Sequence, residues 1–350
     1  MAKYRFGDIV KEVKINVNRD NNPYEFYVAG DHMDSEDLII RRKGRFSTDD
    51  VGPAFTRIFH PGQVLYGSRR TYLKKVAIAD FDGICANTTF VLETKDNNIF
   101  TQELLPFIML SDRFTEWSVS HSKGSTNPYV LFSDLADFEI ELPDINSQRS
   151  LAKKLASAHN VKESYKTLLK CTDELVKSQF IEMFGTPASN ELGLPTKYLN
   201  EISNNLDSKR IPITSGNRKE GPYPYYGASG IVDYVADYIF DETLLLISED
   251  GANLKDRVTP IAFTASGKYW VNNHAHILRF KDISLHNYVE HFINYLNVEK
   301  YLTGMAQPKL NQDRLNAIPV NMPSSTKIAK FHCICKQADK SKQIAFSRAS

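Results

Sequence analysis

The chain has 350 residues, of which 42% are hydrophobic and 24% are charged, and its net charge at pH 7 is +1. This length and composition are typical of a globular protein with two or three domains. The sequence has no run of about 18 apolar residues, and its first ten residues do not resemble a signal peptide, so we expect a cytoplasmic protein without a membrane partner. The near-neutral charge argues against nonspecific binding of nucleic acid through bulk charge.

Residues 1–146 alternate short strand-like runs with turns and are predicted to form a first domain. Segment 59–94 contains three predicted strands, and the polar loop GSRRTYLKK lies between the first two. Arginine, lysine and tyrosine in such a loop can contact phosphates and base edges. A second polar loop, SHSKGSTNP, follows a helix predicted at 102–120. The candidate DNA contacts of this domain are Arg69, Arg70, Tyr72, Lys74, Lys75 and Lys123, and the alternative for each is a solvated loop tip.

Residues 144–185 form the longest stretch without a helix breaker, and we expect one long helix over 147–185. Asn146 or Ser147 can cap its start, and Gly185 with Pro187 ends it. Its apolar residues recur at steps of four and three, which predicts a broad face that pairs with a second helix. The predicted helix-pairing residues here are Leu151, Leu155, Ala158, Tyr165, Leu169 and Val176.

Residues 186–323 repeat this plan as a second predicted domain, and 324–350 as a second spacer helix. Basic and aromatic residues again lie in or beside turn-rich polar segments, such as GNRKEGPYPYYG and ISEDGANL. The candidate DNA contacts of this domain are Arg218, Lys219, Tyr226, Lys255, Lys268 and Lys309.

An internal repeat relates the two halves at a shift of 180 residues, where segment 124–143 matches 304–323 without a gap. The register continues into the helices, where Phe331, Cys335 and Ala338 correspond to Leu151, Leu155 and Ala158. The repeat predicts a tandem duplication of domain and helix. The expected fold class is α+β, with two similar domains of mixed, mostly antiparallel sheets and an antiparallel two-helix coiled coil.

Catalytic and metal-binding alternatives have weaker support. Asn127-Pro128-Tyr129 is close to the motif of adenine methyltransferases but lacks one proline, and its repeat partner Gln307-Pro308-Lys309 indicates a duplicated structural turn. His274 and His276 would share a face of a strand, but a hydrogen-bonded role is favoured over a metal site because no third ligand is close in sequence. The sequence has no phosphate-binding loop, and its four cysteines form no CxxC pair. We therefore expect no catalytic, cofactor-binding or metal-binding residue in this chain.

Several segments carry a family resemblance: YPYYGASGIVDYV, ISEDGANL, GKYWVNNHAHILRF and QPKLNQDRLNAIPVNMP in the second half, and FHPGQVLYGSRRTYLKKVAIADFDGICANTTFVL in the first. Together they resemble the two target-recognition domains of a type I restriction-modification specificity subunit. The resemblance covers essentially the whole chain, although the second helix is shorter than the first.

The resemblance implies a noncatalytic reader of double-stranded DNA, in which each recognition domain reads one half of a bipartite asymmetric site and the helices set the gap. It also implies docking of two modification (methyltransferase) subunits and, through the complex, of a restriction subunit. S-adenosylmethionine, ATP and Mg would then bind those partners. Two alternatives remain open at this stage: an autonomous DNA-modifying enzyme, and a scaffold whose duplicated domains bind protein. The sequence does not predict the DNA site or the gap length.

Overall fold

The computed structural model describes residues 2–18, 21–304 and 307–349, with side chains up to residue 344. The chain divides into two compact units, residues 1–161 and 162–350. The boundary falls inside a long helix.

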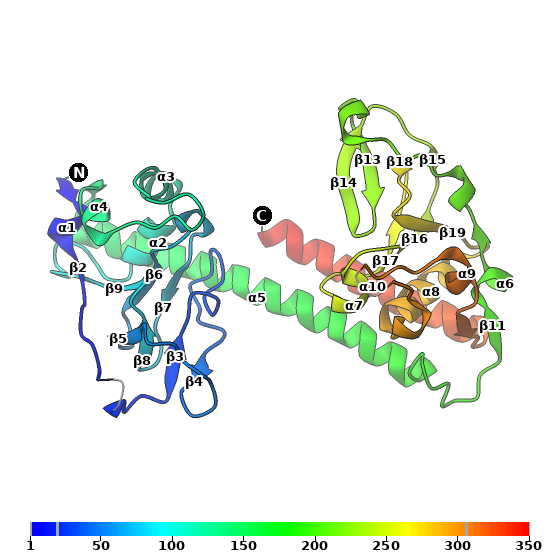
Figure 1. Ribbon diagram of the computed structural model, residues 1–350, viewed down its shortest axis with the longest axis horizontal. Coiled ribbons are helices and arrows are strands. Elements are labelled where there is room, and N and C mark those ends of the chain that lie inside the picture. The colour runs from blue at the N-terminus through cyan, green and yellow to red at the C-terminus, as the bar shows by residue number, and fades with distance from the viewer. Residues whose placement is uncertain (1, 19–20, 305–306, 350) are drawn as a thin grey trace. The chain divides into compact units, whose positions relative to one another are not determined.

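Unit 1 contains two four-stranded sheets and a two-stranded ribbon (Figure 1). The first sheet is antiparallel throughout, whereas the second contains one parallel pair, β3 (Phe26–Val28) with β8 (Gly83–Ala86). The first sheet has the order β2 (Val10–Glu12), β9 (Thr89–Thr94), β6 (Val64–Gly67), β7 (Val76–Ile78). The second has the order β4 (Gly44–Arg45), β3 (Phe26–Val28), β8 (Gly83–Ala86), β5 (Phe55–Phe59), and the ribbon pairs β1 (Ala2–Arg5) with β10 (Glu139–Leu142).

The first sheet of unit 1 lies between a helical layer and the second sheet. Alternate residues of a strand point to opposite faces, and β6 shows this directly. Val64 and Tyr66 pack with the helices, whereas Leu65 packs against residues of the second sheet. The helices are α1 (Phe6–Ile9), α2 (Leu105–Leu110), α3 (Asp112–Ser120), α4 (Phe132–Ala136) and the start of α5 (Ile145–Phe184), and η2 (Thr71–Leu73) is a short 3-10 turn.

Unit 2 has the same architecture with its own strands. The antiparallel sheet has the order β12 (Asn204–Asn205), β19 (Ala275–Arg279), β16 (Leu244–Ser248), β17 (Ala262–Ala265). The mixed sheet has the order β14 (Gly230–Val235), β13 (Tyr223–Gly227), β18 (Lys268–Val271), β15 (Phe240–Asp241), and the ribbon pairs β11 (Thr196–Tyr198) with β20 (Pro319–Asn321). The helices are α6 (Leu199–Ile202), α7 (Asn253–Asp256), α8 (Ile283–Tyr295), α9 (Gln312–Asn316) and α10 (Ser325–Ala349), with 3-10 turns η3 (Asp207–Lys209), η4 (Ser215–Asn217) and η5 (Glu299–Tyr301).

The topologies of the two units match strand for strand. Each strand of unit 1 has its counterpart ten labels later, including the parallel pair β3·β8, which corresponds to β13·β18. The predicted duplication and the α+β class with mixed, mostly antiparallel sheets are confirmed.

The long helix α5 runs from Ile145 to Phe184, close to the predicted 147–185. Asp144, rather than Asn146 or Ser147, caps it, because its carboxylate accepts hydrogen bonds from the backbone N–H groups of both residues at 3.1 Å. At 1.5 Å per residue a helix of 40 residues is about 60 Å long.

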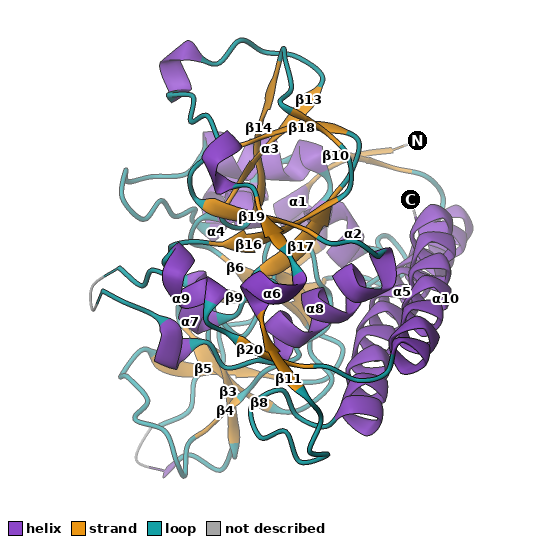
Figure 2. Ribbon diagram, turned by 90° about the vertical axis from the view of Figure 1, so that its right-hand side faces the viewer, coloured by secondary structure: helices purple, strands orange, loops and turns teal. Residues whose placement is uncertain are grey.

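The C-terminal half of α5 packs against α10 within unit 2, and Figure 2 shows the two helices side by side. Phe331 of α10 contacts Phe180 and Phe184, whereas Lys342 forms an ion pair with Asp173. Residue numbers fall along α5 as they rise along α10, so the helices are antiparallel. Val176, Phe331, Cys335 and Ala338 are buried in the core of unit 2.

Leu151, Leu155 and Ala158 lie outside the stretch of α5 that pairs with the described part of α10. The described part of α10 ends at Ala349, which by this register reaches only to about residue 166 of α5. Leu151 and Ala158 are exposed, and Leu155 packs on the core of unit 1. The pairing of Leu151, Leu155 and Ala158 with a second helix stays a prediction, and Tyr165 and Leu169 are half-buried.

None of the described helices is both long enough and apolar enough to cross a membrane.

Candidate nucleic-acid interface

Two polar loops of unit 1 that are distant in sequence are joined by backbone hydrogen bonds. Residues 68–72 follow β6, and residues 123–130 follow α3. Arg70 N–H donates to the Pro128 carbonyl at 2.7 Å, and Val130 N–H donates to the Ser68 carbonyl at 2.9 Å. Lys123 and Tyr129 exchange two further bonds. We call this pair of loops the first platform.

The first platform exposes four of the predicted DNA contacts: Arg69, Arg70, Tyr72 and Lys123. The Arg69 guanidinium lies 5.9 Å from the centre of the Tyr129 ring, and Lys123 pairs with Asp134 at 2.9 Å. Arg70 has a left-handed backbone with φ of +49°, which side-chain-bearing residues rarely adopt. The bond from Arg70 N–H to Pro128 helps to hold this conformation, which turns the loop at an arginine.

The structure places Lys74 and Lys75 away from this exposed group. The Lys74 ammonium pairs with Asp112 at 2.6 Å and with Glu36 at 3.2 Å, and only 18% of its side chain is exposed. The Lys75 ammonium donates to the carbonyl of Gly30. Both ammonium groups are bound by partners within unit 1, and their role as DNA contacts stays a prediction.

Unit 2 builds an equivalent second platform, from residues 249–252 after β16 and from residues 303–304 and 307–310. Gly251 N–H donates to the Pro308 carbonyl, Leu310 N–H donates to the Glu249 carbonyl, and Thr303 and Lys309 exchange two bonds. These bonds reproduce those of the first platform. They align Ser68 with Glu249, Arg69 with Asp250, and Tyr129 with Lys309.

The remaining candidates of unit 2 lie in three different settings. Arg218 pairs with Asp233 at 3.0 Å and lies over Tyr225, and Lys268 lies over the Tyr238 ring. Tyr226 packs against the core between the two sheets, where burial raises the pKa of its hydroxyl. Lys219 and Lys255 are exposed, Lys255 in α7 just after the second platform.

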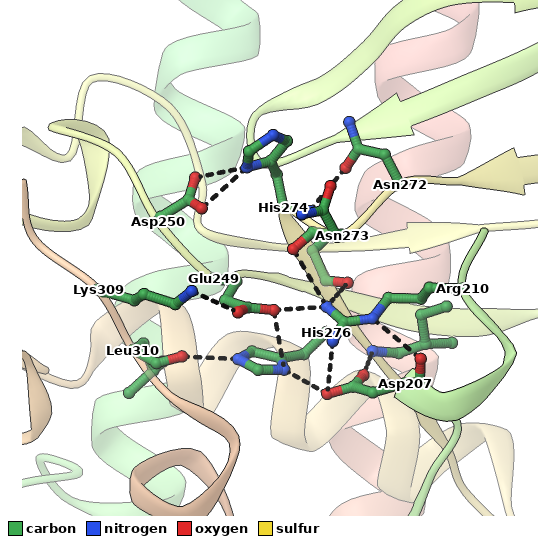
Figure 3. Close-up of polar contacts among 12 residues, drawn as sticks. Asp207, Arg210, Glu249, Asp250, Asn272, Asn273, His274, His276, Lys309 and Leu310 are labelled. Atoms are coloured by element: carbon green, nitrogen blue, oxygen red, sulfur yellow. Dashed lines mark hydrogen bonds and ion pairs between the residues drawn. The ribbon is translucent and has the colours of Figure 1, made fainter. Parts of the chain in front are cut away.

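Sequence reasoning missed a polar group beside the second platform, shown in Figure 3. The exposed His274 ring pairs with Asp250, with Nδ1 2.8 Å from the carboxylate. Arg210 pairs with Glu249 at 2.5 Å, and Lys309 pairs with Glu249 at 3.1 Å. Alignment of the loops could have revealed Asp250, since it takes the place of Arg69. Arg210 had no such signal, because it is 39 residues from its partner Glu249.

The two platforms offer different chemistry from the same backbone frame. The first exposes Arg69, Arg70 and Lys123, which are donors suited to guanine and phosphate. The second exposes His274 and Lys309 beside Asp250, an acceptor suited to the amino group of cytosine, whose own side chain is 16% exposed and pairs with His274. Two such surfaces are able to select different bases.

Two alternatives from the sequence can now be compared with the contacts. Pro128 and Pro308 accept the same backbone bond in their platforms, which confirms a duplicated turn at Asn127-Pro128-Tyr129. His274 and His276 are both hydrogen-bonded to carboxylates.

A duplicated α+β domain with a paired-loop platform on each copy and a long helix defines the class of protein. Comparison with known families identifies that class. The model for the type I restriction modification DNA specificity domain matches residues 4–170 and 195–337. The chain belongs to this family.

Individual relatives agree with this assignment. A putative type I restriction enzyme specificity subunit of Haemophilus influenzae is 34% identical over 127 residues, which cover 36% of this chain and 32% of that protein. The EcoDI specificity subunit of Escherichia coli is 27% identical over 130 residues, covering 36% of this chain and 28% of that protein. The matched segments thus span about a third of the length of these relatives.

Solved structures show the same fold. The S subunit of a type I restriction-modification system from M. genitalium is similar over 99% of this chain and 91% of its own, with a TM-score of 0.64 and 16% identity. A chain from a structural study of complex assembly in the type I system covers 99% of this chain and 93% of its own, with a TM-score of 0.52 and 18% identity.

Proposed function

We propose that this chain is the DNA specificity subunit of a type I restriction-modification complex. Unit 1 reads one half of a bipartite asymmetric site through the first platform, and unit 2 reads the other half through the second. The chain itself carries out no chemistry on DNA. Its role is to bring the partner subunits to one sequence.

One observation carries this proposal most directly. The same backbone hydrogen bonds recur in both units, but the side chains they present differ, as where Arg69 is replaced by Asp250. A scaffold that bound one protein partner twice would gain from identical surfaces. A reader of an asymmetric DNA site needs one frame with two different sets of donors and acceptors.

The partners follow from the same proposal. Two modification subunits would dock on the helices and supply methyl transfer from S-adenosylmethionine, and a restriction subunit would use ATP and Mg. The exposed apolar residues of α5, such as Leu151, Val161 and Leu168, support a docking role for this helix.

The test is reconstitution. The chain is produced together with a type I modification subunit, and methylated adenines are mapped across a genome. The proposal predicts methylation at one bipartite sequence with a constant gap, and none when this chain is omitted. Methylation by this chain without a partner would support the autonomous enzyme instead, and unchanged methylation in its absence would contradict the proposal.

A further inference from the structure

A fully buried histidine lies beneath the second platform. His276 belongs to β19 and is 0% exposed. Its Nδ1 atom lies 2.6 Å from Asp207 Oδ2, and its Nε2 atom lies 2.6 Å from the carbonyl oxygen of Leu310 (Figure 3). Both nitrogens therefore face hydrogen-bond acceptors. A neutral imidazole has only one N–H group, so one of these short contacts requires an additional proton.

That proton belongs on the ring rather than on Asp207. Two groups other than the ring favour an ionised Asp207 carboxylate: the backbone N–H of Ile277 and the guanidinium of Arg210, which lies 3.5 Å from Oδ2. The Ile277 N–H donates to Oδ1 of Asp207 at 2.9 Å. An ionised Asp207 leaves His276 as the donor to both partners, which makes it an imidazolium.

The charges around the ring balance this assignment. Glu249 lies 3.8 Å from Nδ1, and Arg210 contacts both Glu249 and Asp207. Two carboxylates thus face one imidazolium and one guanidinium, and Lys309 reaches Glu249 from the exposed side. Buried charges are tolerated when they are paired and hydrogen-bonded in this way.

The cluster connects the segments that build the second platform. His276 holds the carbonyl of Leu310, whose N–H donates to Glu249, and Lys309 precedes it in the chain. Arg210 also donates to the carbonyl of Ala275 at 3.0 Å. The protonated ring therefore holds the loop that carries Lys309 through the carbonyl of Leu310, and the bond from Leu310 N–H to Glu249 connects it to the loop that carries Asp250.

In unit 1, an uncharged residue occupies the position that corresponds to His276. The strand register pairs Ile247 with His276 and Tyr66 with Phe90, so Phe90 is the counterpart of His276. Phe90 is buried and stacks on Tyr66. The polar cluster is thus a property of unit 2 and is not demanded by the shared fold.

We propose that the imidazolium of His276 is the positioning residue of the second platform, and that it sets the base discrimination of unit 2 but not that of unit 1. This inference rests on the proposed function. His276 lies beneath the platform and acts through Leu310, Glu249 and their neighbours.

The test uses the reconstituted complex and duplexes based on the site that methylation mapping defines. Single base pairs are changed in one half of the site at a time, and binding is measured for the wild type, His276→Phe and His276→Gln. Phenylalanine is the residue that unit 1 carries at this position. We expect either substitution to lower discrimination in the half read by unit 2 by roughly tenfold and to leave the other half unchanged.

A matched control separates positioning from general destabilisation. Leu278→Ala removes a buried side chain from the same strand, two residues away, without removing a platform hydrogen bond. It should lower the melting temperature while keeping discrimination in both halves. Equal loss of discrimination in Leu278→Ala and His276→Gln would overturn the inference.

A spectroscopic measurement tests the protonation state without DNA. In long-range proton–nitrogen NMR spectra of the full chain, the ring signal that disappears in His276→Gln should be that of an imidazolium. The signal of a neutral ring would overturn the inference. If the wild-type complex selects neither half-site, the proposed function fails, whereas normal selection in both halves by His276→Phe contradicts only the role of His276.

Discussion

At the residue scale, Arg70 and Lys74 are both basic residues of one loop, but the structure gives them different surroundings. Arg70 is exposed on the first platform, whereas Lys74 is bound to Asp112 and Glu36. If Arg70 reads a base, Arg70→Ala should cost roughly 1–3 kcal/mol at one base pair of the half-site read by unit 1. If it contacts phosphate, all sequences should weaken alike and the salt dependence should become shallower. Binding to single-substitution duplexes distinguishes these results.

Lys74→Ala is the matched control in the same loop. It should lower the free energy of unfolding by about 1 kcal/mol or less, because partly exposed ion pairs contribute little, and it should change no base preference. If affinity and salt dependence are unchanged in Arg70→Ala, the assignment of the first platform is contradicted.

The residue roles show where prediction from sequence stops. The composition of the loop GSRRTYLKK identified all the basic candidates of this segment. It did not predict that Lys74 binds Asp112, which is 38 residues away in the sequence. Tyr226 likewise looked like a loop residue and packs in a core whose other members come from several strands. Contacts between distant segments depend on the assembled sheets, which local patterns do not encode.

At the element scale, Phe331 and its repeat partner Leu151 form a natural pair of experiments. Phe331 is fully buried among Phe180, Phe184 and His291, whereas Leu151 is 42% exposed. Phe331→Ala should cost about 3–5 kcal/mol of unfolding free energy, and Leu151→Ala much less. Denaturant titration measures both. Equal costs would contradict the packing of α10 on α5 described here.

Helix α8 should make unit 2 sensitive to acid. Burial lowers the pKa of both His286 and His291 from 6.5 to about 4. Their folded-state pKa values lie below the unfolded value, so the unfolded chain binds more protons between these limits. Stability is therefore fully present above about pH 6.5 and falls as the pH drops toward 4, by roughly 2–3 kcal/mol for each histidine.

His291→Gln provides the comparison for this effect. The wild type and the variant have the same carboxylates, which contribute equally to the pH dependence of both proteins. A difference between their curves of unfolding free energy against pH therefore reports on His291 alone. The variant should lose less stability between pH 6.5 and 4. Parallel stability curves for the two proteins would show that His291 does not titrate in this way.

The elements were the most predictable level of this protein. The spacing of Leu169 and Val176 and the breaker Gly185 predicted a helix close to the observed α5, and the 180-residue repeat predicted matching topologies. The partner of each helix face was not predictable, because Leu151 and Phe331 have the same pattern and different neighbours. Only the register of α10 decides which of them is covered.

At the scale of the whole molecule, helix α5 runs from unit 1 into unit 2, and under the proposed function we expect it to set the gap between the half-sites. We expect four residues inserted after Val161, near the boundary of the units, to add about 6 Å and roughly one helical turn. Because DNA rises about 3.4 Å per base pair, the gap between the half-sites should grow by one or two base pairs with both half-sites unchanged. Methylation mapping of the insertion variant reads this directly, and an active variant with an unchanged gap would exclude the helix as the spacer.

Under the proposed function, each unit reads its own half of one DNA site. The most direct measurement exchanges residues 186–323 for the equivalent segment of a relative with a different site and maps methylated adenines in the reconstituted complex. We expect one half of the methylated sequence to become that of the relative while the other half is retained. A site in which both halves change, or in which neither does, would contradict it.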